Sequence, residues 1–163
     1  MGGSKDWNKS DTSYVVRNLE PYYKNILTID KNSFEEIAWR ISKSVFQIHL
    51  SPNQFMHIGV PVEVMGEVSG TIYLHKGNQK ITLERILLEI VNDNDIVVAK
   101  TISDENSFYN YLGLPPGNYR VRVNTMQMGK LGYRLKGELP VFSIVPKRNG
   151  DSKTGIDLEF ISD

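Results

Sequence analysis

One stretch near the middle of the chain, residues 103–123, constrains the fold more than any other. It begins with a polar turn, passes through aromatic residues to a Leu-Pro-Pro-Gly corner, and ends with Tyr119 and Val121 in alternation with arginines. A period of two is typical of a strand with one buried and one solvent-exposed face. Pro116 and Gly117 suit a type II turn, because proline fixes φ near about −65° and glycine accepts a positive φ. The stretch therefore predicts two strands joined by a tight corner.

The rest of the chain repeats this pattern of short strands between turn residues. Strand-like alternation also occurs in residues 60–64, 68–74, 86–91, 96–101, 141–145 and 156–160. About seven short strands over roughly 100 residues indicate an all-β fold, an antiparallel β-sandwich of the immunoglobulin or transthyretin-like kind. We expect residues 75–80 to be a polar loop and residues 126–131 to be one helical turn before Gly132.

We predict that a small β subdomain, residues 13–60, precedes the sandwich, residues 61–163. Residues 1–12 are expected to be a cloning remnant followed by a flexible lead. Ser33 and Glu36 fit a helix capping box, whereas residues 37–41 alternate like a strand, and we favour strands with one helical turn near Ser33. Whether residues 13–60 fold independently or add strands to the sandwich stays open.

The composition excludes several classes of protein. The chain has 19 basic and 19 acidic residues, and this balance argues against a nucleic-acid partner or an anionic-membrane surface built on bulk charge. There are no cysteines, which excludes disulfides, thiolate chemistry and cysteine-ligated metals. No apolar run is long enough to span a bilayer, so we expect no membrane insertion by this segment.

Nothing in the sequence has the pattern of a catalytic site. His49, His57 and His75 lie on different predicted segments, without a paired spacing on one face. No nucleophile elbow, phosphate loop or zinc-protease motif occurs. We therefore expect a protein that is not an enzyme and has no cofactor, with calcium as the one alternative.

The two candidate calcium loops are rich in oxygen donors. The first contains Asn92, Asp93 and Asp95, and the second contains Asp104 and Asn106. Calcium takes about six to eight oxygen ligands, but neither loop fits the EF-hand spacing. Asn and Asp are also the ordinary residues of hairpin turns. Turn chemistry is therefore the first interpretation, and calcium binding is the alternative.

Aromatic and basic residues are the candidate contacts for a ligand. The aromatic clusters are Tyr22, Tyr23 and Trp39 in the first block, and Phe108, Tyr109 and Tyr111 in the second. Carbohydrate-binding sandwiches use such rings, so a glycan is a candidate ligand, although core packing is the default. Tyr119 has a structural role available, with its ring packed inward and its hydroxyl bonded to nearby backbone. Four basic residues are expected on one solvent-exposed face: Arg120, Arg122, Arg134 and Lys136.

The middle stretch also resembles a known group of domains. Asp104-Glu105-Asn106-Ser107-Phe108-Tyr109, followed by Leu112, Leu114, Pro116-Gly117 and Tyr119, resembles the core of carboxypeptidase-regulatory-like and collagen-adhesin B-type domains. The resemblance covers about residues 66–160 and implies a transthyretin-like sandwich that serves as a stalk, spacer or binding domain. Ser107 stands where the group usually has glycine, so Asn106 or Ser107 must accept an unusual φ. The Lys–Asn crosslink of some adhesin domains is not expected, because the matching strands lack the lysine and the acid.

A second resemblance lies upstream, in residues 19–30. The segment Leu19-Glu20-Pro21-Tyr22-Tyr23-Lys24-Asn25-Ile26-Leu27-Thr28-Ile29-Asp30 is similar to one in the carboxy-terminal domains of outer-membrane fimbrial ushers. In ushers this segment opens a small β domain that another β domain follows. The order of the two predicted blocks agrees with that arrangement, but residues 61–163 do not reproduce the final usher domain.

The sequence thus favours a non-catalytic, protein-binding or structural module of a larger Gram-negative cell-envelope protein. The usher resemblance implies a periplasmic position, a parent protein in the outer membrane and a protein partner that is bound through strand-edge addition. The alternative is a cell-surface adhesin, stalk or glycan-binding module of the carboxypeptidase-regulatory-like group.

Overall fold

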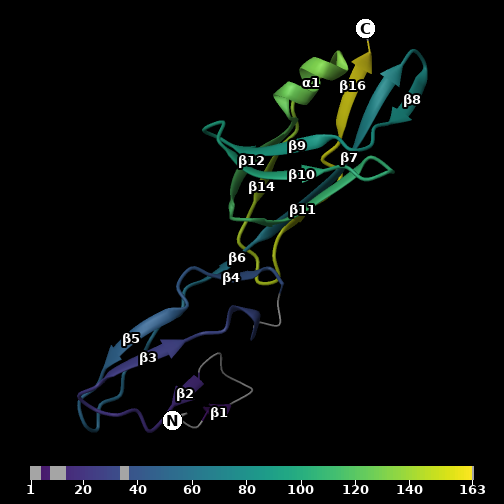
Figure 1. The fold of residues 1–163 in the computed structure, drawn as a ribbon. Helices are drawn as coiled ribbons and strands as arrows, with labels where there is room; N and C mark the ends of the chain where they lie inside the picture. The colour runs from purple at the N-terminus through teal and green to yellow at the C-terminus, as the bar shows by residue number, and fades with distance from the viewer. Residues whose placement is uncertain (1–4, 8–13, 34–36, 163) are drawn as a thin grey trace. The chain divides into compact units, whose positions relative to one another are not determined.

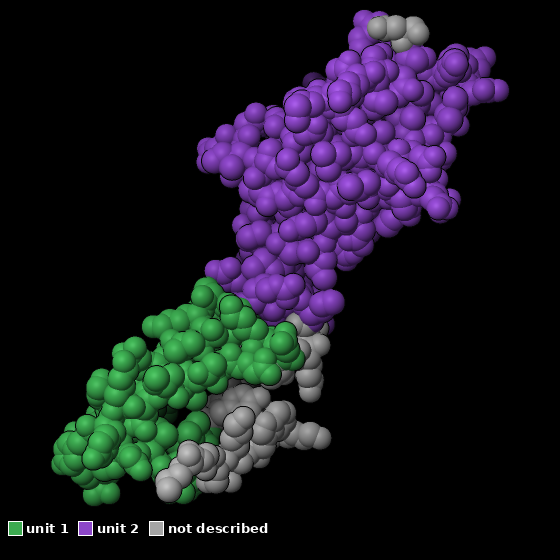
Figure 2. Space-filling model, viewed as in Figure 1, with its two compact units in different colours: residues 1–34, 41–62 green, residues 35–40, 63–163 purple. Residues whose placement is uncertain are grey.

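The computed structural model of the chain describes residues 5–7, 14–33 and 37–162. The chain divides into two compact units, which Figure 2 shows in different colours. Unit 1 comprises residues 1–34 and 41–62, and unit 2 comprises residues 35–40 and 63–163. The backbone therefore passes from one unit to the other three times.

Unit 1 is built from short antiparallel ribbons. Strand β1 (Lys5–Trp7) pairs with β2 (Tyr14–Val16), β3 (Lys24–Thr28) pairs with β5 (Val45–His49), and η1 (Lys31–Ser33) is a single 3-10 turn. Burial alternates along β5, where Ile48 is buried while Gln47 and His49 are exposed. Among the described apolar side chains of unit 1, only Ile41 and Ile48 are buried. This small number of buried side chains is expected, because a two-stranded ribbon encloses little apolar core.

One expectation for the first 41 residues changes, and two agree with the structure. Lys5–Trp7 is a strand rather than part of a flexible lead, and its partner is β2. The helical turn near Ser33 is η1, whereas Glu36 of the suggested capping box lies outside the described residues. The alternation in residues 37–41 corresponds to β4 (Trp39–Ile41), which forms a two-stranded sheet with β6 (Val62–Val64).

Unit 2 is a β-sandwich, as the strand pattern predicts (Figure 1). The first sheet has four antiparallel strands in the order β10 (Val97–Ile102), β9 (Leu87–Asn92), β12 (Gly117–Val123) and β14 (Val141–Ile144). The second sheet has the order β11 (Phe108–Leu114), β7 (Gly66–Lys76), β16 (Leu158–Ser162) and β13 (Tyr133–Leu135), with β8 (Gln79–Thr82) and β15 (Ser152–Lys153) also paired to β7. The last strand, β16, runs parallel to β7.

The core of unit 2 lies between these two sheets. Its fully buried side chains come from both of them: Val68, Ile72, Leu88, Ile90, Tyr109, Leu114, Val121 and Leu158. Both faces of β9 are buried at its centre, as its continuous apolar run predicts. One short helix, α1 (Thr125–Leu131), follows β12 and ends at Gly132 in the left-handed conformation. It corresponds to the helical turn that the sequence predicts.

The expected polar loop at residues 75–80 is instead a β-hairpin. Strand β7 continues to Lys76, and β8 returns from Gln79 after a two-residue turn at Gly77-Asn78. Gly77 has a φ of 59°, which suits the turn that joins tightly paired antiparallel strands. The polar residues that indicated a loop are the exposed side chains of this hairpin.

Gly70, in the middle of β7, marks a close approach of two backbone segments. A Cβ atom at this position would lie 2.1 Å from the carbonyl oxygen of Ile156. Ile156 N also donates to Ser69 O at 3.1 Å, so the segment before β16 is fixed against β7. Only glycine leaves room for that contact.

We expect Gly70→Ala to lower the free energy of unfolding by about 2 kcal/mol or more, because backbone must move to admit the methyl group. Gly129→Ala is the matched control, since a Cβ there meets nothing within 4 Å. In the helix interior the control should stabilise by about 0.5–1 kcal/mol. Urea denaturation of both variants checks this. Equal stability of Gly70→Ala and the parent chain would contradict the packing described.

Candidate functional site

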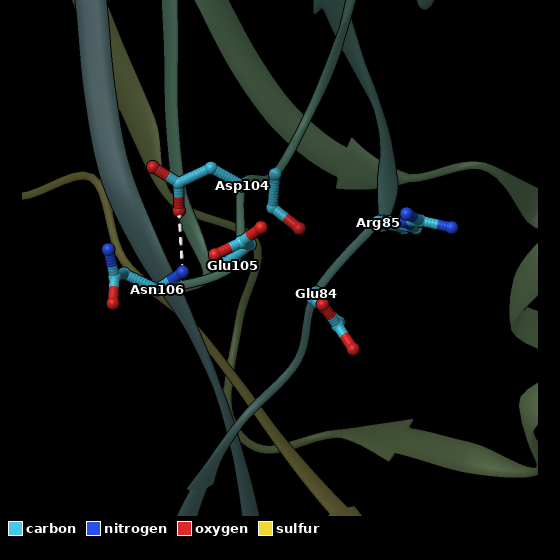
Figure 3. Close-up of a pocket in the computed structure, with 6 residues that line it drawn as sticks. Glu84, Arg85, Asp104, Glu105 and Asn106 are labelled. Carbon is cyan, nitrogen blue, oxygen red and sulfur yellow. Dashed lines mark hydrogen bonds between the residues drawn. The ribbon is translucent and has the colours of Figure 1, made fainter.

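The second candidate calcium loop, with Asp104 and Asn106, lies beside a surface hollow formed by the β8–β9 and β10–β11 connections. The hollow is lined by Glu84, Arg85, Ser103, Asp104, Glu105 and Asn106 (Figure 3). The Asp104 carboxylate accepts hydrogen bonds from the backbone N–H groups of Asn106, at 2.8 Å, and Phe108, at 2.9 Å. Figure 3 shows that the side chains of Glu84 and Arg85 point away from this carboxylate. The acidic groups therefore do not converge on one point.

The first loop, with Asn92, Asp93 and Asp95, lies at another hollow, together with the Pro-Gly corner. This hollow is lined by Asn92, Asp93, Asn94, Pro116, Gly117, Asn118 and Tyr119. The side-chain oxygen of Asn92 accepts from Asn94 N and Ile96 N, both at 3.0 Å. Asp93 accepts from the Asn118 amide at 3.0 Å. These bonds hold the turn between β9 and β10.

The oxygen donors predicted for calcium are thus used by the protein itself. Asp95 faces the guanidinium groups of Arg120, at 3.5 Å, and Arg122, at 3.2 Å. Within the described residues, no group of three or more His, Cys, Asp or Glu side chains is arranged to hold a metal ion. Calcium would have to displace turn hydrogen bonds and ion pairs at either loop, so the geometry favours turn chemistry.

Ser107 is the residue that adopts the unusual φ expected at the end of the acidic turn. Its φ is 64°, in the left-handed region that favours glycine. The side chain is completely buried, and within the described residues its hydroxyl has no hydrogen-bond partner. Ser107 therefore combines backbone strain with an unsatisfied polar group.

The corner at Pro116-Gly117 is not the predicted type II turn. Gly117 has no positive φ; it is the first residue of β12, and the tyrosine ring of Tyr119 packs over it. A Cβ at Gly117 would lie 3.1 Å from the Tyr119 hydroxyl. That hydroxyl donates to Pro115 O at 2.8 Å, and the ring is buried against Phe142. Glycine is required here for the approach of the ring rather than for its own backbone conformation.

A buried carboxylate on the first sheet, Glu89, escaped the sequence analysis. Its side chain is 7% exposed and accepts from the Asn124 amide at 2.7 Å and from Arg122 Nε at 3.1 Å. Lys100 Nζ lies 3.4 Å away. Hydrogen bonding by Asn124, followed by the bonds from Arg122 and Lys100, outweighs desolvation and lowers the pKa of Glu89. The only signal in the sequence is a glutamate within an apolar strand.

A second buried carboxylate, Asp151, closes the loop between β14 and β15. It accepts a hydrogen bond from the Lys147 ammonium group, from Val145 N at 3.0 Å, and from Lys153 at 3.1 Å. The side chain is fully buried. The bond from Lys147 is the main reason that the pKa of Asp151 lies well below its usual range. This aspartate joins the edge of the first sheet to the strand that pairs with β7.

The basic residues expected on one face lie on different sheets, so that prediction is wrong. Arg120 and Arg122 belong to β12, whereas Arg134 belongs to β13 in the second sheet. Lys136, immediately after β13, contacts Glu159 at 3.2 Å. Two further side chains contact the same carboxylate there: Lys80 at 3.2 Å and His75 Nε2 at 3.0 Å. Lys136 and then Lys80 lower the pKa of Glu159 to about 2.

The aromatic candidates separate into buried and exposed groups. Tyr109 is buried, and its hydroxyl donates to Ile156 O at 2.5 Å. Trp39 is half-buried, with its indole N–H donating to Arg148 O at 3.0 Å. In unit 1, by contrast, Tyr22 is 78% exposed and Tyr23 is 68% exposed. The side chain of Phe55 is 91% exposed, although the sequence analysis did not identify it as a candidate. No periodic pattern in the neighbouring residues predicts its exposure.

Comparisons with known proteins return structures but no sequence relatives. No protein-family model matches the chain, and no curated protein matches it. No helix of the described residues is long and apolar enough to cross a membrane.

The chain is similar in structure to two pilins and to the Bacillus anthracis TIE protein. For the minor pilin GBS52 of Streptococcus agalactiae, the identity is 14%, the TM-score is 0.44, and the match covers 92% of this chain and 64% of that one. For the Bacillus anthracis TIE protein, the identity is 19% and the TM-score is 0.46, and the match covers 97% of this chain and 30% of that one. For BcpA, the major pilin subunit of Bacillus cereus, they are 14%, 0.42, 90% and 41%. The chain thus spans less than two thirds of each of these proteins. At such TM-scores the likenesses carry no argument about function, and the assignment of a β-sandwich rests on the strand pairing.

Ser107→Gly is expected to stabilise the chain. It should relieve the left-handed strain of about 1 kcal/mol and remove the unsatisfied hydroxyl as well. Ser107→Ala is the matched control, because it removes the hydroxyl but keeps the Cβ atom. Chemical denaturation should rank stability as glycine above alanine above serine. A less stable glycine variant would show that the Ser107 side chain supports the turn.

Glu89→Gln is expected to destabilise the chain at pH 7 by about 1–3 kcal/mol, because hydrogen bonds to a charged group are lost. A folded-state pKa below the ordinary value of 4.5 means that the carboxylate stabilises the fold above that pH. This stabilisation is lost as pH falls toward the folded-state pKa. Denaturation curves should therefore show the two proteins converging below about pH 4.5. A constant difference from pH 7 to pH 2 would contradict a charged role for Glu89.

Proposed function

We propose that this chain is a non-catalytic, protein-binding structural module of a cell-envelope protein. The observation that carries the proposal is the exposed apolar surface of unit 1. It comprises large side chains that are between 43% and 91% exposed: Val15, Tyr22, Tyr23, Ile26, Val45, Phe55 and Met56. Exposed large apolar side chains can mark a protein interaction site when they gather into one patch.

Unit 1 leaves these side chains exposed. Its ribbon of β3 and β5 has two strands, and among the described apolar side chains of unit 1 only Ile41, on β4, and Ile48, on β5, are buried. An isolated two-stranded ribbon is marginally stable in water. A partner that covers the ribbon would supply the missing burial. Unit 2, with its closed core, would be the scaffold that holds unit 1.

Two placements of this module follow from the resemblances. Residues 19–30 support a soluble periplasmic region of an outer-membrane, usher-like assembly protein, and they lie within the exposed part of unit 1. Residues 66–160 support a stalk or adhesin of the carboxypeptidase-regulatory-like group at the cell surface. Both placements are proposals, and both make the chain a binding or structural module rather than an enzyme.

A glycan is the second candidate ligand, because Tyr22 and Tyr23 present two neighbouring exposed rings. Aromatic faces bind sugars by stacking, and such a site needs polar groups beside the rings to orient the ligand. Tyr22 has a φ of 66°, and its N–H donates to Leu50 O at 2.8 Å, which fixes its position in the turn before β3. A glycan would contact Tyr22 and Tyr23 alone, whereas a protein partner would also cover Phe55, Ile26 and Val45.

Site-specific photocrosslinking in cells tests the proposal. A benzophenone amino acid at Phe55 is expected to crosslink to a protein of the cell envelope, whereas the same probe at exposed Lys130 on α1 should not. Phe55→Ser combined with Ile26→Ser should abolish a crosslink formed from Tyr23 and leave the melting of unit 2 unchanged. Equal crosslinking from both probe sites, or none, would contradict a protein-binding surface on unit 1.

A further inference from the structure

One edge of unit 2 has free backbone hydrogen-bonding groups. Strand β14 is the last strand of the four-stranded sheet and pairs with β12 on one side only. Val121 N donates to Pro140 O, and Tyr119 lies opposite Phe142. Because residues of an antiparallel strand alternate between facing the partner and facing away, Val141 and Ser143 turn their N–H and C=O groups outward. Among the described residues, no group accepts or donates to these four.

The other edge strands of unit 2 carry the devices that prevent strand addition. Strand β10 has an irregularity between Val97 and Ala99, and β11 has one between Leu112 and Leu114. A charged residue lies on each of the other three: Lys80 on β8, Arg134 on β13 and Lys153 on β15. Bulges and edge lysines are the usual protection against pairing with another chain. Strand β14, Val-Phe-Ser-Ile, has neither of them.

The ends of β14 limit how much can be added. Pro140 precedes the strand and Pro146 follows shortly after it. Val145 N is already bonded to Asp151. The open edge therefore consists of Val141 and Ser143, with four backbone groups in all. The Val141 side chain is also 66% exposed.

We propose that β14 pairs with β14 of a second copy of this chain, antiparallel and around a two-fold axis at Phe142. In this register Val141 lies opposite Ser143 of the second copy, and the pair exchanges both backbone hydrogen bonds. The two-fold axis repeats the pair, so all four free groups are satisfied. The two four-stranded sheets become one sheet of eight strands.

The charges of the chain agree with a second copy as the occupant. The formal net charge is zero, so two copies do not repel each other through bulk charge. On the exposed face, Arg120 lies beside Val141 and Asn118 beside Ser143. In the proposed register, Arg120 and Val141 line up with Ser143 and Asn118 of the second copy. No two like charges therefore face each other along this row. The contact is isologous and closes on itself, which gives a dimer rather than a fibre.

Sedimentation equilibrium of the full chain tests the proposal. We expect a concentration-dependent dimer for the parent chain and for Ser143→Ala, which keeps the outward N–H group. Ser143→Pro lacks that N–H group and should raise the dimer dissociation constant at least tenfold. Both variants lose the bond from the Ser143 hydroxyl to Asn118, so that loss cannot explain a difference between them. A parent chain that stays monomeric, or a dimer that Ser143→Pro leaves intact, overturns the proposal.

Disulfide trapping tests the register without relying on the folding of a proline variant. The chain has no cysteine of its own, so single substitutions report one contact each. A mixture of Val141→Cys and Ser143→Cys should form a mixed disulfide under mild oxidation, because directly paired Cα atoms lie about 5.5 Å apart. Val141→Cys alone should crosslink more slowly, since its diagonal partner is about 7–8 Å away. Equal rates for the mixture and the single variant would contradict this register.

Discussion

The close approach of β7 to its neighbours is the constraint on which the rest of unit 2 depends. This eleven-residue strand pairs with β11 and β8 on one side and with β15 and β16 on the other. Gly66 and Gly70 make this possible, because any side chain there would collide with Ile144 or with Ile156 O. Parallel pairing of β7 with the final strand joins the beginning and the end of the sandwich. A change in β7 therefore disturbs four strands together.

Polar anchors connect the two sheets and their loops where apolar packing cannot. Asp151 joins the loop after β14 to β15, and Glu89 joins β9 to Asn124 at the start of α1. Buried carboxylates are costly unless they are fully paired, and both of these have three partners. Unit 1 differs in kind, since neither a buried carboxylate nor an apolar core is present among its described residues. That contrast is the basis of our proposal that unit 2 serves as the scaffold and unit 1 as the binding surface.

Local patterns predicted the parts of the fold that depend on local burial. The alternation of Tyr119 and Val121 with arginines anticipated β12, because a period of two reflects burial on one face. The hairpin at residues 75–80 escaped prediction, since both of its strands expose polar side chains. Gly117 was assigned to a turn, whereas its function is to accommodate the ring of a residue two positions later. A glycine in the sequence does not show whether it is needed for a positive φ in a turn or for the close approach of another side chain.

The polar contacts of the candidate site, such as those of Glu89, were harder to predict, because they join residues that are far apart in the sequence. Glu89 and Asn124 are 35 residues apart, and no spacing rule connects them. The two loops contain the predicted oxygen donors, but Asn92 and Asp104 accept hydrogen bonds from backbone N–H groups, and Asp93 and Asp95 are paired with side chains. The exposure of Phe55 depends on tertiary packing, because no other described part of unit 1 covers its ring. A short stretch of sequence cannot predict that.

Hydrogen exchange of the isolated full chain tests the central claim, that unit 2 is a complete scaffold while unit 1 lacks a core of its own. Protection of an amide reports the free energy of the opening that exposes it. We predict that amides of β7, β9 and β12 exchange only by global unfolding. Amides of β3 and β5 should exchange orders of magnitude faster, through local opening. Equal, global-level protection in β3 and β5 without any partner would contradict the division of roles between the two units.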